Sequence, residues 1–283
     1  MTGVTELIKK LREKTGAGFL DCKKALEEND NDIEKSIEAL RKKGLAKASK
    51  KSDRTANEGA VGIYSNNDLT VLIKVNSETD FAAKSNTFLD FLDALGKLVL
   101  DNNKNITKQQ LLDLRYENGT VNDYFNSMIA KIGENLILND LIIKENLNTN
   151  YSHYIHNSYR NNIGKIISLL EYSCSEKDNE IKILSKNLCM HIAAMKPESL
   201  DIHDLDKNLL ENEKKIQREL ILSSGKPENI IDKILDGKMN KFFSEVTFFN
   251  QSYILDQDKT IRQIIEEYEK NNFKVNSFYL ISL

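Results

Sequence analysis

The sequence predicts an α+β protein in which helices pack on one side of an antiparallel sheet. Two pairs of stretches with alternating apolar and polar residues, each pair joined by a polar turn, indicate β-hairpins. Apolar residues at helical spacing precede, separate and follow these hairpins. With 283 residues, 40% of them hydrophobic and 29% charged, the chain is long enough for several globular modules.

The N-terminal part of the chain predicts a bundle of three short helices, which we place in residues 1–46. Leu7, Ile8 and Leu11 fall on one face of the first helix. Because the helices are short, the core of this bundle is expected to be thin. The expected helices cover residues 6–15, ended by Gly16, residues 18–28, and a stretch from the capping pair Asn31 and Glu34 to Gly44.

A polar and largely basic stretch follows at residues 47–58, and its composition predicts a linker. Residues 59–145 predict the first part of the core. There, residues 60–64 pair with residues 69–76 as a hairpin, and three helices lead to a strand at residues 136–143. Thr107 and Gln110 are expected to begin the second of these helices. The predicted buried stripe of the first helix consists of Phe88, Phe91 or Leu92, Leu95 and Val99. The predicted stripe of the third helix consists of Tyr124, Met128, Ile129 and Ile132.

The hairpin pattern recurs in residues 146–203, the first piece of the second part of the core. Strands at residues 151–157 and 163–172 flank a polar loop around Ser158 to Asn162, and a helix follows over residues 178–194. Residues 246–283 complete this part of the core. They predict a short strand near Tyr253, a helix over residues 260–270 and a last strand over residues 275–282.

Residues 204–245 lie between these two pieces and predict two charged helices joined at Ser224-Gly225-Lys226-Pro227. The apolar stripe on each helix is narrow, as in an arm that projects from the body or meets another chain. The stripe residues are Leu209, Glu213, Ile216 and Leu220 in the first helix and Ile230, Ile234, Leu235 and Met239 in the second.

Charge and hydropathy exclude several classes of protein. The formal net charge of -3 argues against a protein built around broad nucleic-acid contact. No stretch approaches the roughly 18 apolar residues of a membrane helix, and residues 1–15 lack the apolar core of a signal peptide. We therefore expect a cytoplasmic chain that contacts neither nucleic acid nor membrane.

The sequence contains no recognisable catalytic or metal-binding motif. Cys22, Cys174 and Cys189 lack the paired spacing of a metal site, and the histidines form no HExxH pattern. A phosphate-binding loop, a dinucleotide fingerprint and a nucleophile elbow are also missing. We expect no cofactor, no metal and no enzymatic activity.

Residues 70–84, TVLIKVNSETDFAAK, form the most informative stretch of the chain. Their first half alternates and predicts a half-buried strand, and their second half offers several side chains that cap a following helix. Asp80 and Phe81 then lie at the corner between strand and helix. On pattern alone, two interpretations are open: Asp80 caps the helix and Phe81 belongs to the core, or the ring is presented to a partner.

Three segments of the chain form a recognisable combination: LREKTGAGFLDCKKAL at residues 11–26, VNSETDFAAK at residues 75–84, and a third that combines MHIAA and KPE, at residues 190–198, with SGKP at residues 224–227. Together they resemble bacterial elongation factor Ts, the nucleotide-exchange factor for elongation factor Tu (EF-Tu). The first segment is similar to the N-terminal signature of that family and the second to its core signature. Because the segments occur in the family's order over most of the chain, their combination is specific.

The resemblance implies an N-terminal domain of the ubiquitin-associated (UBA) type, a two-part core and a protruding coiled coil. It also implies that Arg12, Phe19 and Leu20 contact the GTPase domain of EF-Tu. His156 is matched to a histidine that contacts the far domain of EF-Tu. The coiled coil allows a homodimer or a two-to-two complex with EF-Tu.

The resemblance further implies that the corner segment promotes GDP release by entering the GTPase near its magnesium ion and disturbing metal and phosphate binding. Two positions depart from the family pattern: Ala82 stands where valine is usual, and Lys74 where an acidic residue is common. Neither departure removes the Asp-Phe pair. The residues of the corner segment are Thr79, Asp80, Phe81 and Ala82.

Three alternative functions are set against this one. The N-terminal bundle alone suggests a ubiquitin-type binding or scaffold module, and the basic residues 47–54 suggest an RNA-binding protein. A hydrolase would combine Asp80 with His156 or His191 and with Cys189. His191 and Cys189 lie beside the apolar stripe of a predicted helix, so we expect them in the core.

Overall fold

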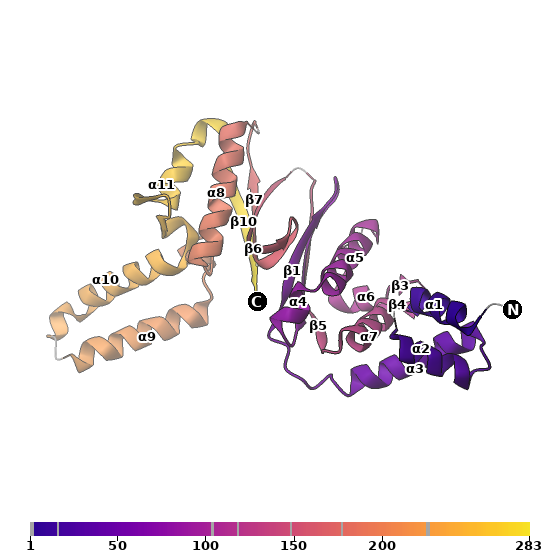
Figure 1. Cartoon of the computed structure of the whole chain (residues 1–283). Helices are drawn as coiled ribbons and strands as arrows, with labels where there is room; N and C mark the ends of the chain where they lie inside the picture. The colour runs from indigo at the N-terminus through magenta and orange to yellow at the C-terminus, as the bar shows by residue number, and fades with distance from the viewer. Residues whose placement is uncertain are drawn as a thin grey trace. The chain divides into compact units, whose positions relative to one another are not determined.

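The computed structural model describes residues 3–15, 17–102, 105–117, 119–147, 149–176, 178–224 and 227–283. Contacts divide the chain into two compact units. Unit 1 consists of Met1–Asn146, Asn157–Ile166 and Ile281–Leu283, and unit 2 consists of Leu147–His156 and Ile167–Leu280. Both units contain helices and antiparallel strands, which confirms the predicted α+β class (Figure 1).

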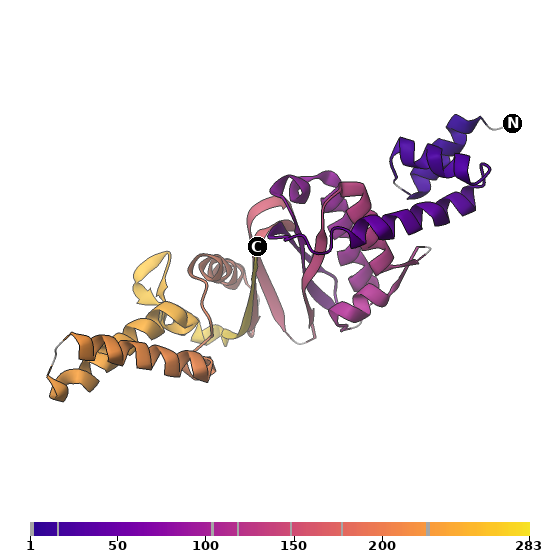
Figure 2. The ribbon, with the colours of Figure 1, turned by 90° about the horizontal axis from the view of Figure 1, so that it is seen from below.

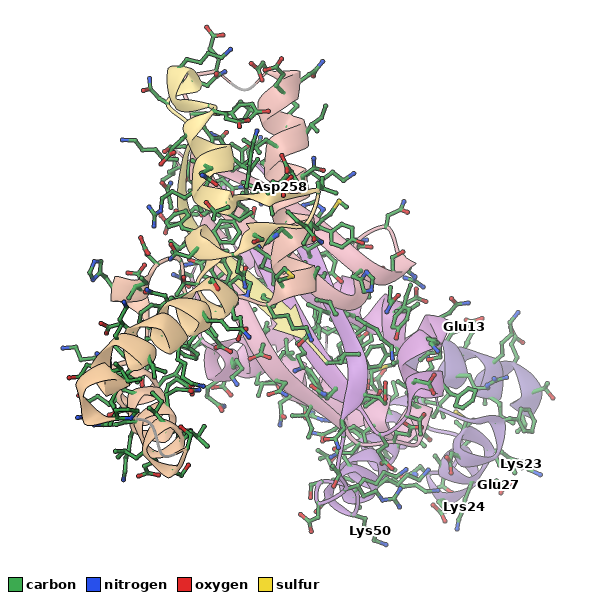
Figure 3. The ribbon with its side chains drawn as sticks, turned by 90° about the vertical axis from the view of Figure 1, so that its left-hand side faces the viewer. Glu13, Lys23, Lys24, Glu27, Lys50 and Asp258 are labelled. Atoms are coloured by element: carbon green, nitrogen blue, oxygen red, sulfur yellow. The ribbon has the colours of Figure 1, made fainter. Side chains whose placement is uncertain are left out.

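Unit 1 begins with the three predicted helices, α1 (Val4–Thr15), α2 (Phe19–Glu28) and α3 (Ile33–Ser49). Their charged residues face outward: Figure 3 shows Lys23, Lys24 and Glu27 along the outer side of α2. Lys23 pairs with Glu27 at 3.7 Å, an i,i+4 pair that supports the helix weakly. The small core of the bundle consists of Ile8, Leu11, Cys22, Ala25 and Leu26.

The boundaries of α3 correct two predictions. The cap is Asp32, whose carboxylate accepts the Lys35 N–H at 3.0 Å, and not Asn31, which has a left-handed backbone. The helix also continues through Gly44, because α3 packs on α7 (Val121–Ile132) at this buried glycine, which lies beside Ala130. Residues 47–49, predicted as linker, are therefore helical. The predicted stop at Gly16 lies outside the described residues.

The predicted hairpin forms the centre of the sheet in unit 1. β1 (Glu58–Ser65) pairs with β2 (Leu69–Ser77), and β5 (Leu136–Glu145) pairs with the other edge of β2. The strand order in this unit is β7-β1-β2-β5, to which β7 (Ile163–Ser173) contributes its residues up to Ile166. Between Lys74 and Val75 the register of β2 against β5 shifts, which leaves Asn139 of β5 as a bulge.

Strand β2 is buried on both faces, whereas its alternation predicted a half-buried strand. Val71 and Ile73 lie in the core, and Leu72 on the opposite face is also fully buried. The prediction was wrong because side chains on both faces of β2 are removed from solvent, and not only those on the core face.

Helices α5 (Asn86–Asn102), α6 (Lys108–Asp113) and α7 pack beside these strands (Figure 1). The capping box of α6 joins Thr107 and Gln110 as predicted. The stripe of α7 is shifted from the predicted one, because Val121 and Phe125 are buried while Tyr124 and Ile132 are only partly buried. A small hairpin, β3 (Arg115–Tyr116) with β4 (Gly119–Thr120), was not predicted.

Strand β7 lies between β6 (Asn150–Arg160) and β10 (Lys274–Ser282), and unit 2 holds β6 up to His156 and β7 from Ile167 onward. The second hairpin is confirmed, with strands that reach further into the predicted loop. Helix α8 (Asn179–Met195) supplies Leu188 and Ile192 to the core of this unit. The remaining elements are η1 (Ile202–Asp204), η2 (Phe248–Asn250), β8 (Ser252–Tyr253), β9 (Asp256–Thr260), α11 (Ile261–Glu266) and η3 (Glu269–Asn271), so the predicted helix over 260–270 is shorter than expected.

Two helices, α9 (Lys207–Ser223) and α10 (Glu228–Val246), pack side by side in unit 2 (Figure 2). We call this pair the arm. On α9 the seam was predicted wrongly: Leu209, Ile216 and Leu220 are exposed, while Ile221 is buried. On α10, Met239 is buried as predicted and Ile234 and Leu235 are partly buried, but Ile231 is buried in place of the exposed Ile230. Gly225 and Lys226 of the predicted turn lie outside the described residues.

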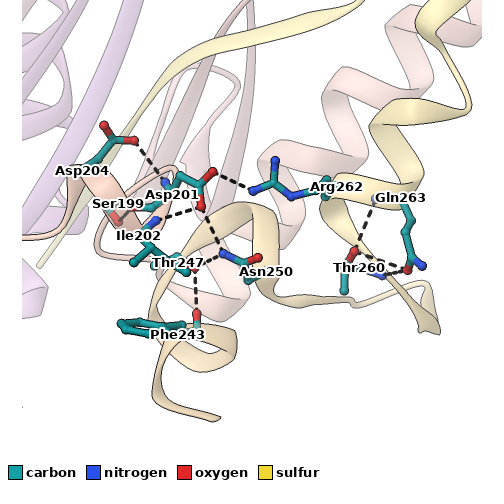
Figure 4. A network of polar contacts seen from close by, with 10 residues as sticks. All are labelled: Ser199, Asp201, Ile202, Asp204, Phe243, Thr247, Asn250, Thr260, Arg262 and Gln263. Atoms are coloured by element: carbon teal, nitrogen blue, oxygen red, sulfur yellow. Dashed lines mark hydrogen bonds and ion pairs between the residues drawn. The ribbon is translucent and has the colours of Figure 1, made fainter. Parts of the chain in front are cut away.

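A polar network fixes the base of the arm (Figure 4). The carboxylate of Asp201 accepts hydrogen bonds from the Ile202 N–H at 2.8 Å and from Arg262 at 2.6 Å. Asn250 donates to the same carboxylate at 3.3 Å and to the Thr247 hydroxyl at 2.7 Å. One carboxylate therefore joins η1, which precedes α9, to η2, which follows α10, and to α11.

Within the described part of the chain, no helix is both long and apolar enough to cross a membrane.

Candidate functional site

The corner after β2 is a five-residue helix, α4 (Asp80–Lys84), whose N-cap is Thr79. The Thr79 hydroxyl accepts the Ala82 N–H at 3.2 Å, and the Ser77 hydroxyl donates to the Thr79 carbonyl at 2.9 Å. The interpretation of Asp80 as the cap was therefore wrong. Because Thr79 takes this role, the Asp80 side chain is available for other contacts.

Phe81 projects into solvent from the first turn of α4. Its exposed fraction is 84%, the highest among the large apolar side chains in the described residues. Ala82 and Ala83 beside it are buried and seat the short helix against β1 and β2. The interpretation of Phe81 as a core residue was wrong. Leaving such a ring in water forgoes roughly 1.5–3 kcal/mol of burial free energy, which contact with a partner would recover.

Asp80 forms an ion pair beside this ring, with its carboxylate 2.6 Å from the Lys84 Nζ. The hydrogen bond from Lys84 lowers the pKa of the Asp80 carboxyl, and the charge of Lys84 adds to this effect. The same hydrogen bond raises the pKa of Lys84. At neutral pH the corner therefore presents an ionised carboxylate next to an exposed aromatic ring.

The corner is held from outside by the turn between α7 and β5. Thr79 donates from its backbone N–H to the Glu134 carboxylate at 2.9 Å and from its hydroxyl at 2.7 Å. The Glu78 carboxylate accepts the Asn135 N–H at 2.7 Å. Sequence reasoning missed these residues, because the contact depends on the register that pairs Ser77 with Leu136. The predicted strand at residues 136–143 was the only signal that pointed to this turn.

The other predicted contact residues lie elsewhere. Phe19 and Leu20 open α2 and are exposed, with exposed fractions of 47% and 78%, and Arg12 is exposed on α1. His156 lies in unit 2 on β6, where its Nδ1 is 3.2 Å from the Tyr154 hydroxyl. Among the described residues of unit 1, no hydrogen bond or ion pair joins Arg12, Phe19 or Leu20 to the corner.

The residues of the hydrolase alternative do not form a catalytic set. Cys189 is fully buried, its thiol donates to the Ser152 carbonyl at 3.2 Å, and burial raises its pKa to about 12. His191 is buried and its Nε2 is 2.9 Å from the Gln251 Oε1. These side chains lie in unit 2 and Asp80 lies in unit 1. A protonated, buried thiol is a poor nucleophile.

The basic stretch that suggested RNA binding makes contacts within the chain. Lys47 binds the Asp21 carboxylate at 3.1 Å, Lys51 binds the Gly133 carbonyl, and Arg54 lies 3.5 Å from Glu78. Lys50 projects outward at the end of α3 (Figure 3), and Arg54 is also exposed. Since three of the four cations already bind groups within the chain, the stretch retains little of the free charge that phosphate binding requires.

Comparison with known proteins identifies the family. The sequence model described as Elongation factor TS matches residues 78–283, which include the corner, the turn at Glu134 and all of unit 2. The chain belongs to the elongation factor Ts family. It is 36% identical over 271 residues to "Elongation factor Ts" of Rhizobium meliloti (strain 1021), covering 96% of this chain and 88% of the relative. It is 38% identical over 277 residues to "Elongation factor Ts" of Clostridium botulinum (strain Alaska E43 / Type E3), covering 96% and 89%.

These matches confirm the resemblance that the three sequence segments predicted. A third relative, "Elongation factor Ts" of Rhizobium etli, is 38% identical over 264 residues and covers 93% of this chain. Family membership assigns the chain a role in translation elongation. It does not say which side chains act, and that question rests on the geometry of the corner.

Proposed function

We propose that this chain is a guanine nucleotide exchange factor that binds EF-Tu·GDP, disturbs its magnesium and phosphate site and promotes exchange of GDP for GTP. The observation that carries this proposal is the 84% exposure of Phe81 on a capped and buttressed corner. Such a side chain is suited to insertion into a partner, because the capped helix that carries it is already ordered before binding.

Exchange requires binding that differs between two states of the partner. A factor that binds the nucleotide-free GTPase more tightly than the GDP form must weaken GDP binding by the same ratio. Each tenfold acceleration of release requires about 1.4 kcal/mol of such preference. Burial of the Phe81 ring supplies roughly 1.5–3 kcal/mol, which corresponds to one or two factors of ten. The remainder has to come from a wider interface.

Other exposed side chains are proposed to supply that interface. Phe19 and Leu20, with Arg12, would contact the GTPase domain from α1 and α2, which we take as a UBA-like bundle. His156 on β6 would contact the far domain of EF-Tu. The arm would act as a coiled coil that supports a homodimer or a two-to-two complex through its outward residues.

Asp80 and its neighbours would perturb the metal. A carboxylate near Mg²⁺ or its water ligands competes for a coordination shell that demands near-octahedral oxygen geometry. Thr79, Asp80, Phe81 and Ala82 would form the inserted segment, with the buried Ala82 setting how closely α4 approaches the sheet. The reaction needs no acid, base or nucleophile, so we propose that the chain is not an enzyme and acts in the cytoplasm without a cofactor.

A release assay tests this function. EF-Tu loaded with fluorescent GDP is mixed with excess unlabelled GDP, with or without the chain. We expect the chain to accelerate release strongly and Phe81→Ala to lose about ten- to hundredfold of that acceleration. The Phe81→Ala variant should keep the stability of the wild type. Release that the chain does not accelerate would overturn the proposal.

A further inference from the structure

The turn between α7 and β5 and the corner exchange hydrogen bonds in both directions. The Glu134 carboxylate accepts both the N–H and the hydroxyl of Thr79, at 2.9 and 2.7 Å. In return, the Asn135 N–H donates to Glu78 at 2.7 Å. Bonds to a carboxylate are shorter and stronger than neutral ones, and two parallel bonds fix direction as well as distance.

Glu134 is itself held in place by the elements on either side. Gly133 ends α7 in the left-handed conformation, with φ of 89°, which turns the chain back toward β2. Two residues after Glu134, β5 begins with Leu136 paired to Ser77. Asn135 is buried, and its side-chain amide donates to the carbonyls of Ser52 and Arg54 at 3.3 and 2.8 Å. The carboxylate therefore projects from a rigid turn.

The Thr79 hydroxyl links Glu134 to Phe81. A hydroxyl has one hydrogen to donate and lone pairs to accept. Here the hydrogen goes to Glu134 and a lone pair accepts the Ala82 N–H at 3.2 Å. By taking the hydrogen, Glu134 directs the lone pair toward the first turn of α4, and this turn carries Phe81.

We propose that Glu134 is a positioning residue for Phe81, an inference that rests on the exchange function proposed above. The Phe81 ring is 84% exposed, so packing within the chain does not set its place. Helix α4 has five residues, too few to be stable without support from its surroundings. The position of the ring therefore follows from the position of the cap, which Glu134 fixes.

The test is a double-mutant cycle in the full chain with the fluorescent-GDP assay. Stimulated release is measured over a range of factor concentrations, which gives a maximal rate and a half-saturating concentration. We expect Glu134→Ala to lower the maximal rate by about tenfold, because misplacement of a contacting group is costly even when binding persists. The half-saturating concentration should change by less than about twofold, since the wide interface is retained. Glu134→Gln keeps an acceptor oxygen and should fall between Ala and wild type.

The cycle separates positioning from general structural support. If Glu134 acts through Phe81, adding Glu134→Ala to Phe81→Ala should cost less than about twofold more. An equal loss in both backgrounds, or a Glu134→Ala or Glu134→Gln rate equal to wild type, would overturn the inference. Glu266→Ala, at an exposed position of α11 in unit 2, is the matched control and should behave as wild type. A wild-type chain that fails to accelerate release would instead overturn the exchange function itself.

Discussion

The corner and the arm both leave apolar side chains in water, but they do so on different foundations. At the corner, one ring projects from a turn whose neighbours Ala82 and Ala83 are buried and whose cap bonds to Glu134. Along the arm, Leu209, Ile216 and Leu220 face outward from α9, which packs on α10 through a thin seam. The comparison teaches that an exposed side chain on a rigid corner favours one contact of fixed position. Exposed side chains on a helix pair with a small core favour a broad and adaptable contact.

The largest expected effect is a difference in stability between a variant in the core of unit 1 and a variant at the corner. Phe91, fully buried in α5, and Phe81 are both phenylalanines of unit 1. We expect Phe91→Ala to lower the free energy of unfolding by about 3–5 kcal/mol, because it leaves a cavity. Phe81→Ala should change it by less than about 0.5 kcal/mol, since nothing is uncovered. Urea titrations of both variants measure the difference, and comparable losses would mean that Phe81 supports the fold.

Two adjacent residues of α9 allow the same comparison between a buried and an exposed apolar side chain in the arm. Ile221 is 2% exposed and Leu220 is 53% exposed. Ile221→Ala should destabilise the α9–α10 pair by about 2 kcal/mol, and Leu220→Ala by less than about 0.5 kcal/mol. Hydrogen exchange of the α10 amides reports this local stability directly. Equal protection in the two variants would mean that the seam lies elsewhere.

Loss of the cap should weaken the corner by a smaller amount. Thr79→Ala removes the hydroxyl that Ala82 N–H and Glu134 share, and we expect a cost of about 1 kcal/mol. Thr79→Ser keeps the hydroxyl and should restore most of that loss. Exchange of the Ala82 and Ala83 amides would show faster opening in the alanine variant alone. Rapid exchange in the serine variant too would implicate the threonine methyl group instead of the hydroxyl.

Mild acid should loosen the base of the arm while sparing the corner. His191 Nε2 contacts Gln251 Oε1, and the Gln251 amide donates to the Glu245 carbonyl at the end of α10 at 2.7 Å. Burial lowers the pKa of His191 below its ordinary value of 6.5, and the hydrogen bond to Gln251 only partly offsets this. Because the folded pKa is depressed, protons bind more readily to the unfolded state, so stability is full above pH 6.5 and falls as pH decreases below it.

Protonation would also place a hydrogen on His191 Nδ1, which faces the Ile254 N–H at 3.4 Å. We expect faster exchange of the α10 amides at pH 5.5 than at pH 7.5, after correction for intrinsic rates. His191→Gln should reduce this difference. His153, whose pKa is also lowered by burial and by Lys186, remains titratable in that variant and contributes the rest. An unchanged pH dependence in His191→Gln would assign the whole effect to other groups.

The parts of the fold that sequence predicted were set by local chemistry. Thr107 and Gln110 formed their capping box, and the hairpin around Asn66 formed because its side chain accepts the N–H groups of Asp68 and Leu69, at 2.9 and 2.7 Å. The prediction failed where distant segments decide. Helix α3 continues past Gly44 because α7 packs there. The local sequence of either helix does not indicate that the two helices will be in contact.

The predictions for the arm and for the corner failed for two further reasons. On α9, the neighbouring pairs Leu209–Leu210 and Leu220–Ile221 offer two apolar stripes one residue apart, so periodicity did not choose between them. At the corner, the sequence pattern favoured a core phenylalanine, because phenylalanine is usually buried. The residue type alone does not reveal that this particular ring is exposed. The contact of Thr79 with Glu134 depends on strand register, which only the folded sheet defines.

The bulge at Asn139 has a consequence for how the chain behaves at high concentration. Strand β5 is the edge of the sheet in unit 1, and an unpaired edge invites strands of other molecules to add to it. The extra residue interrupts the regular spacing of N–H and C=O groups, and the Lys108 Nζ occupies the Asn139 carbonyl at 2.6 Å. An incoming strand would meet a broken ladder and a positive charge. The irregularity thereby disfavours addition of a strand from a second copy to this edge.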